Sequence, residues 1–405
     1  RVLVLLIALH DVGKFSRHFQ AKSEIGWQAA VLGERKDPPA GVRHDAIGYA
    51  MLGNEDAEVA QLNGLRDVLA PDWLNSEFAA LWAAVTGHHG QPALQPHSTN
   101  WHFGLRGGAR EAADGFVADV VALLGPTECL PQVDNRAISL LSWTVAGLTV
   151  ISDWIGSSET WFRYTQPHYS LAEYWNGTSD LPGARAQADK ALTASGILSV
   201  DVASMKSLDD AKRLLPSIMN LSPLQELALQ HPLPIGPTLV IVEDVTGSGK
   251  TEAALLLSAR MMADGRADGL FFALPTMATA NVMYERLSVS YRQLFADDVE
   301  ASLVLAHGRR ALHPGFTRSI LADASAQPDH AIAETAADET ATAACAAWIA
   351  DDRRKAFLAH VGIGTIDQAV LGVLPSRHQS LRLWGLADRV LVIDEAHSYD
   401  CLLYT

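Results

Sequence analysis

Cysteine is scarce in this chain and never clustered. The three cysteines of the 405-residue sequence are Cys129, Cys345 and Cys401, and no two of them form a C-x-x-C pair. Disulfide scaffolds and thiolate zinc sites need closely spaced cysteines, so the sequence excludes both classes. The same scarcity predicts a protein of the reducing cytoplasm.

Basic residues are also in short supply. The sequence has 31 lysines and arginines against 46 aspartates and glutamates, which gives a formal net charge of −15 at pH 7. Nonspecific coating of DNA needs a broad basic surface, so this composition excludes that mode of binding. The composition still allows DNA to bind in a narrow basic groove on an otherwise acidic protein.

Long apolar runs are missing as well. No stretch reaches the ~18 uninterrupted apolar residues that are typical of a membrane span. The nearest, "AISLLSWTVAGLTVISDWIG", contains Asp153 and is predicted to be a core helix, and the first residues lack the anatomy of a signal peptide. We therefore expect no membrane partner. The chain has no initiator methionine and begins inside an apolar element, so we expect it to be a fragment of a longer protein.

The remaining composition predicts a well-packed multidomain protein, because 48% of the residues are hydrophobic and only 19% are charged. Residues 1–175 show helical periodicity and predict an all-α domain, and the turn-rich residues 176–215 predict a linker. In residues 216–405, the apolar runs "PTLVIVEDV", "GLFFALPT" and "DRVLVIDEAH" alternate with helical patterns, which predicts an α/β lobe with a parallel sheet. An Ala-rich acidic stretch near 320–347 is predicted to be a surface insertion.

The opening stretch "RVLVLLIALHDVGK" ends a buried element in a histidine and a carboxylate. Burying such groups costs several kcal/mol unless they are paired or bound to a metal. Further histidines and one aspartate fall at three other predicted helix ends, which is the pattern that a site for one or two divalent metals requires. Lys14 would share a helix face with the first pair and could hold a scissile phosphate. The candidate metal ligands are His10, Asp11, His44, His88, His89 and Asp153.

Simpler interpretations exist for each member of this set. A single histidine at a helix end is usually a cap, and Asp153 could form a hydrogen bond in the core. The stretch "RHDAIG" also offers a second His-Asp pair, His44-Asp45, for which His10 would be the upstream histidine. We prefer the first pair, because Asp11 follows a buried element and precedes Gly13 and Lys14.

The second half carries a phosphate-binding pattern, "DVTGSGKTEAAL", between a predicted strand and a helix. It departs from the usual P-loop pattern because Asp244 stands in the place of the first glycine. Backbone amides of such a loop cradle phosphates, Lys250 would reach the β- and γ-phosphates, and Thr251 would bind Mg²⁺. The segment "VLVIDEAH" is its predicted partner, with Asp394 on Mg²⁺ and Glu395 polarising the attacking water. The expected nucleotide-binding residues of these two segments are Thr246, Gly247, Ser248, Gly249, Lys250, Thr251, Asp394, Glu395 and His397.

The segments "LALHDVGKF", "RH", "GHHG" and "SDWIGS" resemble the HD nuclease domain of type I CRISPR-associated nuclease-helicases. The resemblance implies two divalent transition metals (Mn, Fe, Co or Ni), one held by His10, Asp11 and Asp153. It implies a second held by Asp11, His44, His88 and His89. The family also has a histidine upstream of its His-Asp motif, before residue 1 of this sequence.

The second half resembles the superfamily 2 helicase part of the same family, whose fold is RecA-like. "SPLQ" places Gln225 where such motors read adenine, although a glutamine there is as easily structural. "ALPTMATANVMYERL" and "GTIDQAVLGVL" resemble the DNA-strand and coupling motifs, although their polar residues could also be helix caps. The implied DNA-binding residues are Pro275, Thr276, Asn281, Thr365, Asp367 and Gln368.

The resemblance implies a metal-dependent nuclease for single-stranded DNA, with Asp11 and Lys14 at the catalytic site, coupled to an ATP- and Mg²⁺-dependent 3'–5' helicase. Its partner would be a crRNA-guided surveillance complex (Cascade-type) on an R-loop. The alternative is an HD-type nucleotide phosphohydrolase fused to an unrelated ATPase lobe, and a third reading is a docking fragment with both sites inert. We expect residues 1–405 to contain only the first motor lobe, and therefore to bind ATP with little hydrolysis.

Overall fold

The computed structural model describes residues 1–24, 27–35, 42–53, 76–93, 104–125, 135–163, 169–308, 313–314, 316, 349–350 and 354–399. The chain forms two compact units, Arg1–Ala191 with Leu374–Trp384, and Leu192–Val373 with Gly385–Thr405. The division near residue 191 falls inside the predicted linker, which contains helices α9 (Ala184–Ser195) and α10 (Leu208–Leu214). The predicted insertion near 320–347 lies outside the described residues.

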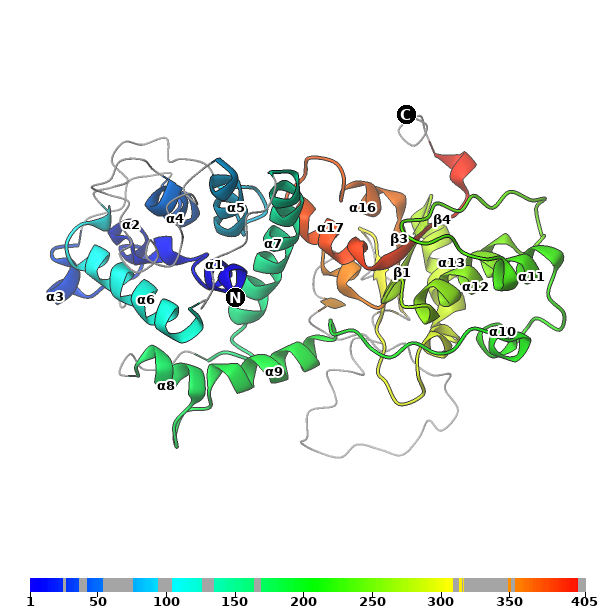
Figure 1. Cartoon of the computed structure of the whole chain (residues 1–405), viewed down its shortest axis with the longest axis horizontal. Helices are drawn as coiled ribbons and strands as arrows, with labels where there is room; N and C mark the ends of the chain where they lie inside the picture. Colours follow the sequence, from blue (N-terminus) through cyan, green and yellow to red (C-terminus); the bar gives the residue numbers. More distant parts are fainter. Residues whose placement is uncertain are drawn as a thin grey trace. The chain divides into compact units, whose positions relative to one another are not determined.

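The first unit is helical throughout its described part (Figure 1). Its core forms where α1 packs against α5, α6 and α7, and the side chains of Leu5, Leu6 and Trp82 are fully buried there. The Trp82 indole satisfies its buried N–H by donating to the carbonyl of Gly48 at 3.0 Å. The helices of this unit are α1 (Val2–Ala8), α2 (Arg17–Gln20), α3 (Ala29–Leu32), α4 (His44–Gly53), α5 (Ser76–Thr86), α6 (Gly108–Leu124), α7 (Asn135–Gly156) and α8 (Leu171–Asn176), with the short 3-10 turn η1 (Val12–Phe15).

Gly13 lets the turn after α1 approach α4 closely. A Cβ at this position would overlap the backbone carbonyl of His44 and lie 2.7 Å from the Gly48 nitrogen, so a side chain has no room there. The glycine of "HDVGKF" therefore fixes the distance between the first His-Asp pair and the start of α4.

Helix α7 is the most apolar long helix of the described residues. By length and composition, its Arg136–Gly156 portion could cross a membrane, a test that the core helix of a soluble protein also passes. Helix α7 packs against α5, but only 33% of its most apolar window is buried, so it contributes one face to the core and is not buried all round as a core helix would be.

The second unit contains a four-stranded parallel sheet in the order β2-β3-β1-β4. β1 (Gly269–Leu274), β2 (Leu303–Ala306) and β3 (Val361–Thr365) are buried along their whole length, as expected for parallel strands covered on both faces. β4 (Arg389–Ile393) is one of the two edge strands of the described sheet, and α12 (Lys250–Ala263) and α13 (Met277–Ser288) pack against the sheet. The remaining elements of this unit are α11 (Pro223–Gln230), α16 (Ile366–Val370) and the 3-10 turns η4 (Tyr291–Leu294), η6 (Lys355–Leu358) and η7 (Ala396–Ser398), whereas most of α17 (Gln379–Ala387) groups with the first unit.

One predicted strand is wrong. The segment "PTLVIVEDV" precedes the phosphate loop but forms no strand, and the side chains of Leu239 and Ile241 are 86% and 82% exposed. The start of the segment is bonded to Arg266 instead of to a strand, because the Arg266 guanidinium donates to the Gly236 carbonyl and to the Thr238 hydroxyl. An apolar run is buried as a strand only when a neighbouring strand takes its hydrogen bonds, and no described strand pairs with this one.

Candidate metal centre and nucleotide site

The six predicted metal ligands meet in the first unit. His10 and Asp11 follow α1, His44 begins α4, His88 and His89 follow α5, and Asp153 lies in the last turn of α7. Their ligand atoms form two groups within 4.8 Å, one of His10, Asp11, His88 and Asp153 and the other of His44, His88 and His89. His88 is common to both groups, whereas the resemblance had placed it in the second alone.

His10 presents one defined nitrogen to this cluster. Its Nδ1 lies 2.8 Å from the Ile7 carbonyl, a bond that only a protonated Nδ1 can donate. Nε2 is therefore the atom that faces the Asp11 Oδ2 at 3.4 Å and the Asp153 Oδ1 at 3.6 Å. Burial alone would lower the pKa of His10, but the interactions with these two carboxylates outweigh it and raise the pKa to about 9.

Asp11 divides its two oxygens between two sets of partners. Oδ1 faces the Nε2 atoms of His44 at 3.2 Å and His88 at 3.4 Å, whereas Oδ2 faces His10 and pairs with the Lys14 ammonium. Burial opposes ionisation here, yet the interactions with the His10 and His44 rings hold the pKa of Asp11 well below its usual range. The carboxylate is thus anionic, with one oxygen facing His44 and His88 and the other facing His10, which is the geometry of a bridging ligand.

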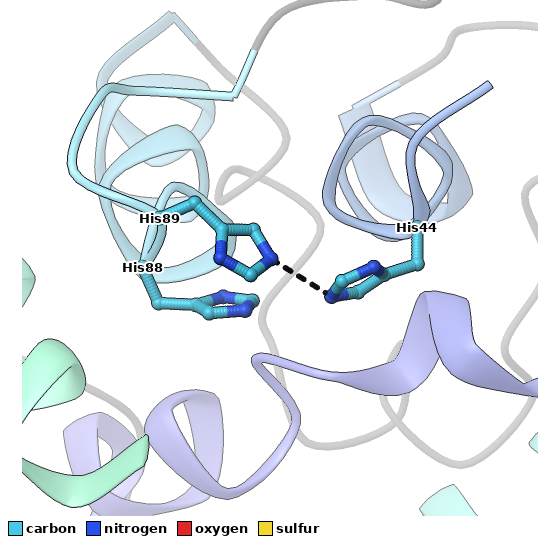
Figure 2. A group of neighbouring side chains, drawn as sticks. All are labelled: His44, His88 and His89. Atoms are coloured by element: carbon cyan, nitrogen blue, oxygen red, sulfur yellow. Dashed lines mark hydrogen bonds between the residues drawn. The ribbon is translucent and has the colours of Figure 1, made fainter. Parts of the chain in front are cut away.

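The three remaining histidines face one another (Figure 2). Nε2 of His89 lies 3.2 Å from Nε2 of His44, and the rings of His88 and His89 are 4.2 Å apart. Burial and the charge of His10 lower the pKa of His88 to about 4, and burial and His44 lower the pKa of His89. Both rings are therefore neutral near pH 7, the form in which imidazole binds metals.

The cluster leaves buried polar atoms without hydrogen-bond partners. Among the described residues these atoms include His10 Nε2, Asp11 Oδ1 and both ring nitrogens of His88. Buried polar atoms rarely stay unpaired in folded proteins, so a ligand is expected on them. Imidazole and carboxylate donors together suit transition metals better than Mg²⁺. The residues present therefore fit the divalent metals that the sequence predicted.

The second His-Asp pair is not a metal-binding pair. His44 joins the cluster, but Asp45 accepts from the Arg43 guanidinium at 2.9 and 2.5 Å and belongs to neither candidate group. The preference for His10-Asp11 over His44-Asp45 thus agrees with the geometry. Lys14 is 37% exposed and pairs with Asp11 at the solvent side of the cluster.

In the second unit, the phosphate loop and the "DEAH" segment meet. Thr251, in the first turn of α12, donates its hydroxyl to the Asp394 carboxylate at 3.2 Å, although the two are 143 residues apart. Asp394 follows β4, and its N–H donates to the carbonyl of Ala273 in β1. The Lys250 ammonium donates to the carbonyls of Asp244 and Val245 and so lies against the loop. Hydroxyl and carboxylate oxygens are the ligands that Mg²⁺ prefers.

Gln225 packs against this loop but is occupied by local contacts. Its Oε1 accepts from the N–H of Ser222, which completes the capping box of α11, and its Nε2 points to the Gly249 carbonyl at 3.5 Å. The Ser222 hydroxyl donates to the Ser248 carbonyl at 3.1 Å. The residue predicted to read adenine therefore also has a structural role, and its contact with adenine stays a prediction.

The residues after β4 include a strained backbone and an unpredicted tyrosine. Glu395 has a φ of +54°, and its carboxylate lies 3.3 Å from the His397 ring. The hydroxyl of Tyr399 donates to the Asp394 carbonyl at 2.8 Å. Burial and the charge of Asp394 raise the pKa of Tyr399 to about 12, so it remains a donor. A lone tyrosine two residues past the motif gave no sequence signal for this contact.

The predicted DNA-binding residues gather at the carboxyl edge of the sheet. Pro275 and Thr276 follow β1, and Thr365, which ends β3, is in register with Leu274 of β1. Thr276 caps α13, Asp367 is exposed in α16, and Gln368 is buried with its side-chain oxygen unpaired. Of these residues, Thr276 therefore has a structural role as a helix cap beside the predicted one.

Asn281 reveals a partner that the sequence analysis missed. Its side-chain oxygen lies 2.8 Å from Nε2 of His307, which follows β2 and is 3% exposed. The segment "LAHGR" that carries His307 matches no motif used above, so only the fold connects it to this edge.

Known proteins resemble this chain in sequence. The family model for the Cas3 HD domain matches residues 1–162. The CRISPR-associated endonuclease/helicase Cas3 of Escherichia coli (strain K12) is 30% identical over 416 residues, which cover 98% of this chain and 44% of that protein. The Cas3 endonuclease/helicase of Thermus thermophilus is 31% identical over 98% of this chain and 40% of its own length.

Solved structures give the same result. The crystal structure of T. fusca Cas3 with ATP superposes with a TM-score of 0.69 at 26% identity, over 98% of this chain and 41% of that one. The chain thus spans less than half the length of these relatives. Residues 1–162 thus match the Cas3 HD-domain family model, and nearly the whole chain is similar in sequence and fold to CRISPR-associated Cas3 nuclease/helicases.

Proposed function

We propose that the first unit cleaves single-stranded DNA with two divalent transition metals bound at the His/Asp cluster. The observation that carries this proposal is the orientation of Asp11, whose two oxygens face different histidines. Such a carboxylate can hold two metals ~3.5–4 Å apart, the separation used in two-metal phosphodiester hydrolysis.

The residues divide into two ligand sets. His10, Asp11 and Asp153 would hold one metal, and the histidine that begins α4 and the two that follow α5 would hold the other with the second oxygen of Asp11. His88 lies within reach of both. When bound, such metals lower the pKa of water and stabilise the attacking and leaving oxygens.

The chain's own contribution is to orient the ligands and the substrate. The Ile7 carbonyl keeps Nε2 of His10 directed at the cluster, and Gly13 fixes the spacing to His44. Lys14 lies at the solvent side of the cluster, where its ammonium can leave Asp11 and bind the scissile phosphate.

For the second unit we infer an ATP- and Mg²⁺-dependent motor that translocates 3'–5' on DNA. The Thr251–Asp394 contact supports a Mg²⁺ site at the phosphate loop. The residues at the carboxyl ends of β1 and β3 would contact the DNA strand, because ligands of parallel α/β sheets bind at that edge.

We further infer recruitment to DNA by a crRNA-guided surveillance complex of the Cascade type. A structure described as a CRISPR RNA-guided surveillance complex before nicking contains a chain that superposes with a TM-score of 0.55 at 25% identity. The function would then be antiviral defence in the cytoplasm, by degradation of the strand displaced in an R-loop.

The test asks whether DNA cleavage depends on the His/Asp cluster of the first unit or on the phosphate loop of the second unit. Circular single-stranded DNA is incubated with Mn²⁺ and no ATP, using the unmodified chain, His88→Ala and Lys250→Ala. We expect His88→Ala to lose cleavage and Lys250→Ala to retain it, because the metal ligands all precede residue 160. Loss in Lys250→Ala but not in His88→Ala would overturn the proposal. Hydrolysis of free nucleotides with intact DNA would favour the HD-type phosphohydrolase instead.

A further inference from the structure

A segment from the second half of the sequence belongs to the first unit. Residues Leu374–Trp384, here called the strap, group with Arg1–Ala191 although α16 and β4, on either side in sequence, belong to the second unit. None of the motifs that define the nuclease or the motor includes the strap, so its contacts have no assigned role.

The backbone of the strap is bonded to the loop that carries two metal ligands. His378 donates its N–H to the carbonyl of Gly90 at 2.9 Å, and Gly90 directly follows His88 and His89. His378 is one of only two non-glycine residues with a positive φ, +59°, in the described part of the chain. Such a conformation persists only where the surrounding structure holds it.

Gly90 is required for this contact. It has a φ of +95°, and a Cβ there would lie 2.7 Å from the nitrogen of His378 and 2.9 Å from its ring. The final glycine of "GHHG" is thus explained by close approach of the strap rather than by the metal ligands themselves.

The side chain of His378 reaches the second ligand-bearing element. Its ring packs against Trp154, with centroids 5.2 Å apart, and Trp154 directly follows Asp153 in α7. The residue is only 7% exposed. One residue of the strap therefore contacts the immediate neighbour of His89 and the immediate neighbour of Asp153.

A third contact holds the strap on α7. At Gly147 a Cβ would lie 2.6 Å from the Cβ of Trp384 and 2.9 Å from the Ser380 carbonyl, so α17 rests directly on the backbone of α7. The strap is therefore fixed at both ends of its contact with the metal-ligand elements.

We propose that His378 is a positioning residue for the metal centre, which connects the ends of α5 and α7 and so sets the distance between the two ligand sets. The inference rests on the proposed metal site. Outer residues that orient metal ligands typically contribute ~10–100-fold to metal affinity. In this role His378 acts through its contacts with Gly90 and Trp154.

The test measures binding of Mn²⁺ alone to the metal-free full chain by titration calorimetry, together with its thermal unfolding. His378→Gly accepts the positive φ and keeps the N–H but deletes the ring, and His378→Asn also tolerates this φ. His231→Ala changes an exposed histidine of the second unit and serves as the matched control. Asp11→Asn reports whether Mn²⁺ binds at the cluster at all.

We expect His378→Gly to unfold near the temperature of the unmodified chain but to bind Mn²⁺ about tenfold more weakly. His378→Asn should lie between the two, and His231→Ala should be unchanged. An unaltered isotherm for folded His378→Gly would overturn the inference. If His378→Gly does not fold, an unaltered isotherm for folded His378→Asn would overturn it as well. A failure of Asp11→Asn to weaken binding would instead refute the metal site.

Discussion

Metal binding at His10 should release a proton, and the apparent affinity for metal should therefore rise with pH. The carboxylates of Asp11 and Asp153 raise the pKa of His10 to about 9 against the opposing effect of burial. Nδ1 is committed to the Ile7 carbonyl, so a metal can bind only at Nε2. The imidazolium proton on that atom must leave before a metal can take its place.

The size of the effect follows from the pKa. With a pKa of about 9, about one His10 side chain in a hundred is neutral at pH 7. The metal set of His10, Asp11 and Asp153 should therefore bind ~100-fold more weakly at pH 7 than after deprotonation, which corresponds to ~2.7 kcal/mol. His88, with a pKa of about 4, is already neutral and adds no proton.

Calorimetric titration with Mn²⁺ in two buffers of different ionisation heat measures the protons released. His10 should contribute nearly one proton at pH 7 and about half a proton at pH 9. His10→Gln is the matched control, because it cannot hold the proton while the set of His44, His88 and His89 remains. Equal proton release from both proteins, or an affinity that is constant from pH 7 to 9, would refute the reasoning.

Three further results are expected from the same cluster. Without metal, folded His10 keeps its proton to about pH 9 while the unfolded chain loses it near 6.5. The stabilisation that protonated His10 provides is therefore complete below pH 6.5. The free energy of unfolding should fall by up to ~3 kcal/mol between pH 6.5 and 9. Urea unfolding in the presence of a chelator measures this change, and a rise with pH would contradict the reasoning. Asp11→Asn should weaken both metals in a Mn²⁺ titration and His44→Ala only one, whereas equal single-site losses would exclude a bridging Asp11. Gly13→Ala should displace α4, cost ~1–3 kcal/mol in urea unfolding and weaken the metal held by His44, whereas Gly115→Ala, which meets no atom within 4 Å, should do neither.

The sequence was sufficient to predict which six side chains gather in the first unit, because each of them is marked locally. His10-Asp11 ends a buried helix and His88-His89 ends another, and a buried charge at such a place needs a partner. The sheet was predictable for a similar reason, since β1 and β4 are short apolar runs that end in polar residues.

The failures concern contacts between distant residues. Whether an apolar run becomes a strand depends on a neighbouring strand, and the run containing Leu239 has none among the described residues. The sharing of His88 between both ligand sets depends on where α5 ends relative to α1. His307 and His378 lie in segments without a motif, and only the fold brings them to Asn281 and Gly90.

The charge of the cluster would allow an acidic protein to attract the proposed DNA substrate. Without metal, the carboxylates of Asp11 and Asp153 are balanced by the His10 imidazolium and the Lys14 ammonium, so the centre offers phosphate little attraction. The whole chain, at −15, repels a polyanion. Two dications that displace one proton would leave the centre strongly positive within a few ångströms of Lys14. Metal loading should therefore create the local field that draws the phosphodiester in, and a metal-free protein should bind single-stranded DNA poorly at this site even with every side chain in place.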